Sequence, residues 1–140
     1  MRKRILKASF DATGGKAIGT HSLAGKLPVG AIITNVLIDA TTTFTSATDA
    51  ATISVGAQTA GDLVAATAIS GARNIWDAGR HGSLVGNFAL DGNALTAVAM
   101  ADADSAATVK VASTPKALSV AVAVEALTAG VFTIYVEYVY

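Results

Sequence analysis

The chain has 140 residues and no cysteine, which excludes disulfide bonds, thiolate metal sites and cysteine nucleophiles. Its ten basic and ten acidic side chains give a formal net charge of zero, so no overall field attracts nucleic acid or an anionic membrane, and we expect neither as a partner. Because 52% of the residues are hydrophobic and only 14% are charged, we expect a folded protein with part of its surface covered by another protein.

The chain opens with a basic segment that contains Arg2, Lys3 and Arg4. We expect residues 1–10 to form either an extended N-terminal arm or a first strand. The apolar run after the basic cluster is too short for a secretion signal. A nucleic-acid interface would need interleaved aromatic residues or a wider basic face. We therefore predict that these three side chains contact an acidic surface of another protein.

Alternation of apolar and polar side chains is the main pattern along the chain, and it indicates strands with one buried face. In the segment 31–40 it predicts that Ile32, Thr34, Val36 and Ile38 share one face. The same pattern predicts shorter strands over 3–10, 16–23, 41–45, 51–56, 63–69, 84–90, 94–100 and 108–112.

The glycine-punctuated segment 70–82 is the longest stretch without alternation, and we expect a binding loop there. It contains Trp76 and Arg80, which are candidate interface residues. Large aromatic side chains are common both in cores and at the centres of interfaces. For Trp76 the sequence therefore leaves two roles open, a core side chain or an anchor in an interface.

Asp91 and Gly92 stand between two predicted strands, 84–90 and 94–100, and they favour a hairpin because both tolerate the positive φ of a tight turn. Alanine is a competing signal in this region, since 30 of the 140 residues are alanine and alanine favours helices. A short helix over 94–107 is the alternative. No apolar stripe of helical period persists there, so strands fit better.

The strongest alternation lies near the end of the chain, over 118–125 and 131–140, and it predicts one core-facing side for each segment. In the first segment this side carries Leu118, Val120, Val122 and Val124. In the second it carries Phe132, Ile134, Val136, Tyr138 and Tyr140, with Tyr135 on the other side. The short connection 127–130 predicts that these two strands form an antiparallel hairpin. The last strand carries Tyr135, Tyr138 and Tyr140, and it is our candidate for the contact between subunits, because rigid aromatic side chains supply contact area at little cost in ordering entropy.

These elements predict an all-β protein with one domain over residues 1–140. Roughly eight to ten short strands fit an antiparallel β-sandwich, either jelly-roll-like or immunoglobulin-like. Low net charge and high apolar content predict a homo-oligomer. Closed cyclic symmetry is usual for identical chains, and we favour a trimer.

Catalytic chemistry has little support in the sequence. Histidine, the usual general base near neutral pH, occurs only at His21 and His81, and no acidic residue is spaced to orient either one in a Ser/His/Asp arrangement. The two glutamates, Glu125 and Glu137, both fall in the C-terminal strand region and do not suggest a hydrolase pair. We predict that the protein is not an enzyme.

Metal and phosphate sites have no better support in the sequence. Asp102 and Asp104 lack the remaining ligands of a calcium loop, so a solvated turn is the simpler interpretation. The glycine-rich segments 14–16 and 79–82 match neither of the common phosphate-loop patterns. We predict no metal site, no cofactor and no cofactor-binding residue.

Three stretches carry a resemblance to a known class of proteins. They are 27–33, with the sequence LPVGAII; 52–56 and 62–66, with TISVG and DLVAA; and 127–130 and 135–140, with LTAG and YVEYVY. Together they resemble small head-module proteins of tailed bacteriophages, which are structural components of the virion.

The resemblance implies a jelly-roll-like decoration or cement protein, often trimeric, that is made in the cytoplasm of the host bacterium. Such a protein lies on the capsid exterior, and its partner is the major capsid protein, whose neighbouring subunits it bridges. Repeated binding on a lattice multiplies weak contacts. A head-fibre, tail or receptor-contacting β-domain of a phage virion is the alternative, and it would bind its target through exposed loops.

Overall fold

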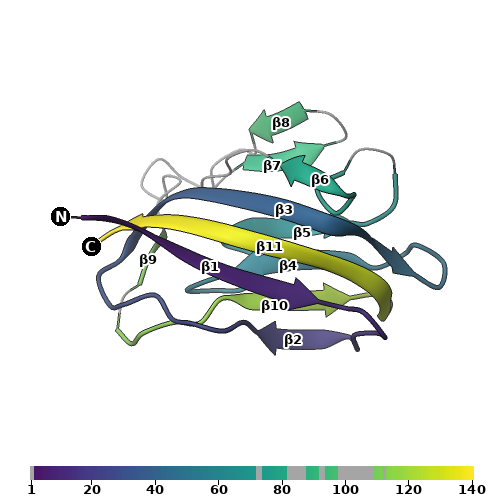
Figure 1. Cartoon of the computed structure of the whole chain (residues 1–140), viewed down its shortest axis with the longest axis horizontal. Helices are drawn as coiled ribbons and strands as arrows, with labels where there is room; N and C mark the ends of the chain where they lie inside the picture. Colours follow the sequence, from purple (N-terminus) through teal and green to yellow (C-terminus); the bar gives the residue numbers. More distant parts are fainter. Residues whose placement is uncertain (1, 72–73, 82–87, 92–93, 98–108, 112) are drawn as a thin grey trace.

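The computed structural model describes residues 2–71, 74–81, 88–91, 94–97, 109–111 and 113–140. These residues form eleven strands and no helix, and nine of the strands belong to two antiparallel sheets that pack face to face (Figure 1). The predicted all-β sandwich is therefore confirmed.

The first sheet has the order β1-β11-β3-β6, and β9 also pairs with β3. Its strands are β1 (Lys3–Asp11), β3 (Ile32–Ser46), β6 (Gly79–His81), β9 (Val109–Lys110) and β11 (Leu127–Val139). The second sheet has the order β2-β10-β4-β5. It consists of β2 (Gly19–Ser22), β4 (Thr52–Gly56), β5 (Val64–Ala68) and β10 (Ser119–Ala123). A separate hairpin contains β7 (Phe88–Asp91) and β8 (Ala94–Ala97).

The path of the chain is that of a jelly roll rather than of an immunoglobulin domain. Strands β1, β3, β6 and β11 form one sheet, and β2, β4, β5 and β10 form the other, so the chain crosses between the sheets at every step except β4 to β5. Eight strands connected in this way make two Greek keys. The elements β7, β8 and β9 are inserted between β6 and β10.

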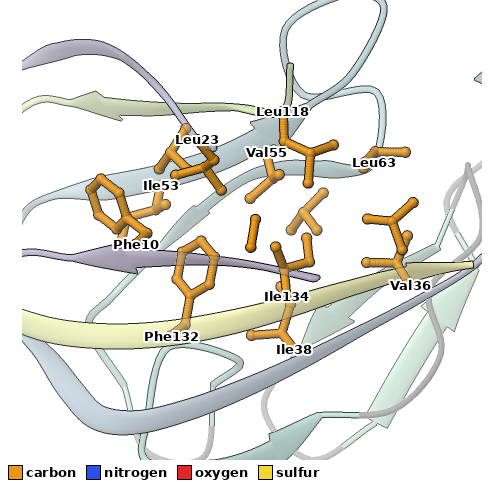
Figure 2. Close-up of a cluster of buried hydrophobic side chains, with 14 of the residues drawn as sticks. Phe10, Leu23, Val36, Ile38, Ile53, Val55, Leu63, Leu118, Phe132 and Ile134 are labelled. Carbon is orange, nitrogen blue, oxygen red and sulfur yellow. The ribbon is translucent and has the colours of Figure 1, made fainter. Parts of the chain in front are cut away.

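The core lies between the two sheets (Figure 2). Phe132 and Ile134 of the first sheet point toward Ile53 and Val55 of the second, and all four side chains are buried. Each is one of the alternating apolar residues of its strand, which is why period-2 patterning specifies the inner face of both sheets. The predicted inner face of the last strand is confirmed for Phe132, Ile134 and Val136.

Aromatic rings fill the end of the core where β3 and β4 connect. Phe132 lies at the centre, with ring centroids 5.5 Å from Phe10, 5.8 Å from Phe44 and 5.7 Å from Trp76. Trp76 has no exposed surface, and its indole nitrogen donates a hydrogen bond of 3.2 Å to the carbonyl of Thr67. Of the two roles that the sequence left open, Trp76 has the core role.

A β-bulge at the start of β3 changes which residues face the core. Glu137 of β11 is opposite Asn35, whereas the next residue, Tyr138, is opposite Ile33, so Thr34 is the extra residue. A single extra residue reverses the alternation. Val36 and Ile38 are buried as predicted, but Ile33 faces the core in place of Ile32.

The predicted hairpin between the last two strands is wrong. β10 pairs with β2 and β4 in the second sheet, whereas β11 pairs with β1 and β3 in the first. The chain leaves β10 through Val124, which has a positive φ of 72° and is 69% exposed. Strands that face each other across a core bury the same alternating residues as strands that pair side by side, so the pattern did not distinguish them.

Other predicted elements differ in detail. The separate strands expected over 31–40 and 41–45 form one long strand, β3. The N-terminal segment is a strand, β1, rather than an arm. The predicted loop 70–82 contains the short strand β6. Pairing of β7 with β8 confirms the hairpin predicted from Asp91 and Gly92, although the turn residues 92–93, like Asp102 and Asp104, lie outside the described residues.

The connection from β10 to β11 is fastened to the turn between β3 and β4 by one carboxylate. Glu125 accepts hydrogen bonds from the hydroxyl of Ser46, from the backbone and hydroxyl of Thr48, and from the backbone N–H of Ala50. The hydrogen bond from Ser46 is the main cause that holds the pKa of Glu125 below its ordinary value of 4.5. Partial burial of the carboxylate opposes this effect, and the bonds from Thr48 and Ala50 reinforce it.

A lowered pKa in the folded state makes Glu125 a source of acid sensitivity. The unfolded chain binds the proton more readily, so this contribution to stability is complete above the ordinary pKa and is lost as the pH falls through the folded value. We expect the Glu125→Gln variant to lose less stability than the wild type between neutral pH and about pH 3, measured as the urea midpoint. Ser46→Ala should reduce the same pH dependence, and equal slopes in all three proteins would contradict the assignment.

Candidate functional site

The outer face of the first sheet carries a shallow groove of about 210 Å³. We call it the outer groove, and its lining residues are Ile5, Asn35, Leu37, Tyr135 and Glu137. β11 crosses its middle, because Ile5 of β1 is opposite Glu137, and Leu37 of β3 is opposite Tyr135. Ile5 is 63% exposed and Leu37 is 37% exposed, so two aliphatic side chains stand on the solvent face of the sheet.

Charged and polar groups surround this apolar floor. The ammonium group of Lys3 lies 3.7 Å from a carboxylate oxygen of Glu137, and that carboxylate also accepts a hydrogen bond of 2.9 Å from the hydroxyl of Thr34. The ammonium group of Lys7 lies 5.8 Å from the centre of the Tyr135 ring. An exposed ion pair contributes little to stability. Glu137 has two side-chain partners, Lys3 and Thr34, at the rim of the groove.

The two termini of the described chain meet at one end of the first sheet, which we call the termini end (Figure 1). Arg2 and Tyr140 exchange two backbone hydrogen bonds of 3.0 Å. Lys3 and Arg4 follow on β1, and Arg4 is opposite Tyr138. The structure therefore brings together the basic residues and two of the tyrosines that the sequence singled out.

The three tyrosines have different surroundings. Tyr138 faces inward and packs against the edge of the core. Tyr135 faces outward and lines the outer groove. Tyr140 is 55% exposed at the termini end. The last strand thus presents aromatic side chains on both of its faces, as its sequence predicted.

Two of the candidate interface residues lie elsewhere. Arg80 is exposed on β6, at the opposite edge of the first sheet from β1, and it is opposite Asp39 of β3. Trp76 is fully buried, so its ring is not available to a partner. The structure does not bring either residue to the termini end or to the outer groove.

Strand β1 lies at an open edge of the first sheet. Hydrogen-bonded and non-hydrogen-bonded residue pairs alternate along its ladder with β11, and Arg2–Tyr140 is a hydrogen-bonded pair. The even-numbered residues of β1 therefore bond to β11, and the odd-numbered residues direct their backbone groups toward the open edge. Lys3 and Lys7 are among these residues, and lysine on an edge strand opposes the addition of another strand. We therefore place the candidate interface on the outer face and at the termini end rather than along this edge.

The residues weighed for catalysis lie far apart in the fold. His21 is on β2 of the second sheet and contacts the carbonyl oxygen of Ala17 at 2.8 Å. His81 is on β6 of the first sheet and contacts the carbonyl oxygen of Asp77 at 2.9 Å. Among the residues that the structure describes, no cluster of three acidic or histidine side chains could hold a metal ion. That same part of the chain contains no helix able to span a membrane.

Sequence reasoning missed most of the outer groove. Ile5, Asn35, Leu37 and Glu137 were not among the candidate residues, although Tyr135 was. The available signal was the position of Ile5 between Lys3 and Lys7, where an aliphatic side chain shares the outward face of a strand with two charged ones. Leu37 could not be placed in the same way, because its neighbours across the sheet depend on the pairing of β3 with β11.

Comparison with solved structures finds the same fold in two phage capsids. A chain in the capsid asymmetric unit of cyanophage Pam1 aligns with a TM-score of 0.58 and 20% identity, over 97% of this chain and 83% of that chain. A chain in the acidic stable capsid of Helicobacter pylori bacteriophage KHP30 aligns with a TM-score of 0.51 and 19% identity, over 97% of this chain and 86% of that one. No protein-family description and no curated protein matches the sequence. At these identities, the likeness establishes a shared fold.

Proposed function

We propose that the protein is a non-enzymatic structural component of a tailed-phage virion, and that it binds the capsid exterior as a decoration or cement protein. The observation that carries the proposal is the jelly roll shared along 97% of the chain with chains of two phage capsids. Because this chain covers more than four fifths of each of those chains, they are components of similar size.

The outer groove supports a role in protein binding. Exposed Ile5 and Leu37 provide apolar area, and Tyr135 adds an aromatic side chain of the kind that is enriched at the centres of interfaces. Lys3, Lys7 and Glu137 supply a charged rim. We propose that this face contacts the major capsid protein and bridges its neighbouring subunits.

A homo-oligomer, with a trimer favoured, fits the same proposal. A trimer would match a three-fold or quasi-three-fold position on an icosahedral shell. Three copies held together would each contribute one groove, so contacts that are weak singly would add up on the lattice.

The copy number and location of the protein in virions test this function directly. We expect the protein in intact virions in a fixed ratio to the major capsid protein, and we expect surface-labelling reagents to reach it. Virions that lack it should release DNA at a lower temperature, and addition of the purified protein should restore the wild-type release temperature. Recovery in the tail fraction alone would contradict the proposal and support the tail alternative.

Substitution in the outer groove tests which face binds. We expect Ile5→Ser to weaken binding to capsids that lack the protein by about tenfold or more, because burial of an isoleucine side chain contributes about 1.5–3 kcal/mol. Ile18→Ser is the matched control, since Ile18 is 57% exposed and does not line the groove. Sedimentation with capsids measures both variants, and an equal effect of the two would remove the groove from the contact.

A further inference from the structure

The neutral net charge conceals a separation of charge along the molecule. Six basic residues gather at the termini end. Three stand at the start of β1, one on β9 beside the start of β3, and two at the bridge between Leu27 and Lys116, just before β10. The six are Arg2, Lys3, Arg4, Lys26, Lys110 and Lys116. Two described carboxylates lie near them, and both are engaged: Glu137 pairs with Lys3, and Asp62 accepts backbone hydrogen bonds from residues 57–59.

The opposite end of the sandwich has the opposite sign. We call it the turn end, because the turn between β3 and β4 lies there (Figure 1). Asp11 ends β1, exposed Asp49 lies in that turn, and Glu125 lies in the connection from β10 to β11. Lys16, beside Asp11, is the single basic side chain among the described residues of this end.

The two ends act as independent surfaces. Lys3 and Asp11 stand at the two ends of β1, roughly 26 Å apart at about 3.3 Å per residue. The Debye length is about 8 Å at physiological ionic strength, so the charges of one end do not neutralise those of the other within a molecule. A neighbouring molecule can bring the two signs into contact.

We infer that copies of this chain associate head to tail, with the termini end of one copy against the turn end of the next. A two-fold contact through either end would place like charges together, which the charge distribution disfavours. A head-to-tail contact pairs opposite charges, and it closes into a ring when the rotation between neighbours permits. The termini end also presents two arginines and the exposed ring of Tyr140, residue types that dominate binding energy at interfaces. The inference concerns this chain alone and does not depend on the capsid role.

Charge reversal at each end, measured by sedimentation velocity, tests the inference. The wild type should show association at some protein concentration below about 1 mM. This upper limit is the order of the effective concentration that neighbouring sites experience within one assembly. Association should weaken at least about tenfold between roughly 50 mM and 500 mM salt. Arg4→Glu alone and Asp49→Lys alone should each weaken it. Asp49→Lys should weaken it at least as much, because it leaves two cations against two carboxylates at the turn end, whereas Arg4→Glu leaves the termini end basic.

Arg80→Glu is the matched control, since it reverses a charge on the side of the first sheet, away from both ends. It should leave association unchanged. Circular dichroism establishes that every variant keeps the fold. A wild type that stays monomeric throughout this range would overturn the inference. So would a loss caused by Arg4→Glu that Asp49→Lys does not share. None of these outcomes bears on whether the protein binds capsids.

Discussion

Replacement of Phe132 by alanine is expected to lower the free energy of unfolding by about 3–5 kcal/mol, the usual cost of removing a buried aromatic ring. Phe132 has no exposed surface, and its ring contacts those of Phe10, Phe44 and Trp76, so the cavity would open among three rigid groups. Small domains are stable by only about 5–15 kcal/mol, so the loss would be a large part of the total.

The melting temperature of Phe132→Ala should accordingly fall by roughly 10–20 °C. Tyr135→Ala provides the comparison, because Tyr135 lies on the same strand but faces outward over the groove. Tyr135→Ala should lower the urea midpoint much less than Phe132→Ala does. Similar effects at the two positions would show that the aromatic cluster is not the centre of the core.

Gly130→Ala is expected to destabilise the protein by roughly 2–6 kcal/mol, which combines overpacking with backbone strain. Gly130 has a φ of 129°, a conformation that L side chains rarely adopt. A β-carbon there would overlap the ring of Phe44 and also its Cα atom. The backbone of Phe44 belongs to β3 and cannot move aside without disturbing the ladder between β3 and β11.

Gly19→Ala separates the two contributions. Gly19 has a similar φ of 139°, but a β-carbon at this position would meet no atom within 4 Å. This variant should show backbone strain alone, about 1–3 kcal/mol, and therefore a smaller loss than Gly130→Ala in the same urea titration. Equal losses would mean that contact with Phe44 adds nothing.

The sequence predicted the strands more successfully than their pairing. Alternation placed Val120, Val122, Phe132 and Ile134 in the core, because a strand with one buried face must place every second side chain inside. It did not show that β10 and β11 belong to different sheets, since either arrangement buries the same residues. The jelly roll follows from long-range pairings that a local pattern does not contain.

Local irregularities limited the prediction in a different way. At the bulge, the hydroxyl of Thr34 donates a hydrogen bond to the carboxylate of Glu137, which is 103 positions away in the sequence, so no local pattern indicates this position. Trp76 stood among polar residues in a glycine-rich segment, yet the fold of its turn carries the indole into the core. The turn is held by Asn74, whose side-chain amide donates to the carbonyls of Ile69 and Gly71 and whose side-chain oxygen accepts from the backbone N–H of Trp76.

The residues of the candidate site were partly predictable from the sequence, but their proximity was not, because it depends on strand pairing. At the termini end, residues 2–4 and the last tyrosines come from two separate segments, and both were recognised by residue type alone. The proximity of these two segments depends on the pairing of β1 with β11. Lys26, Lys110 and Lys116 were not recognised, because only the pairings of the fold bring them to this end. The outer groove needs that pairing and the one between β11 and β3, so it becomes visible only once the first sheet is assembled.

The central position of β11 also constrains how the chain folds. β11 pairs with β1 on one side and β3 on the other, although residues 47–126 separate it from the nearer partner, β3. During synthesis, β1 and β3 therefore leave the ribosome long before the strand that joins them. Contacts so distant in sequence place folding on the order of milliseconds to seconds. Until β11 has been made and has paired with them, the apolar faces of β1 and β3 lack this part of their cover. At this stage the nascent chain is most exposed to aggregation and to chaperone binding.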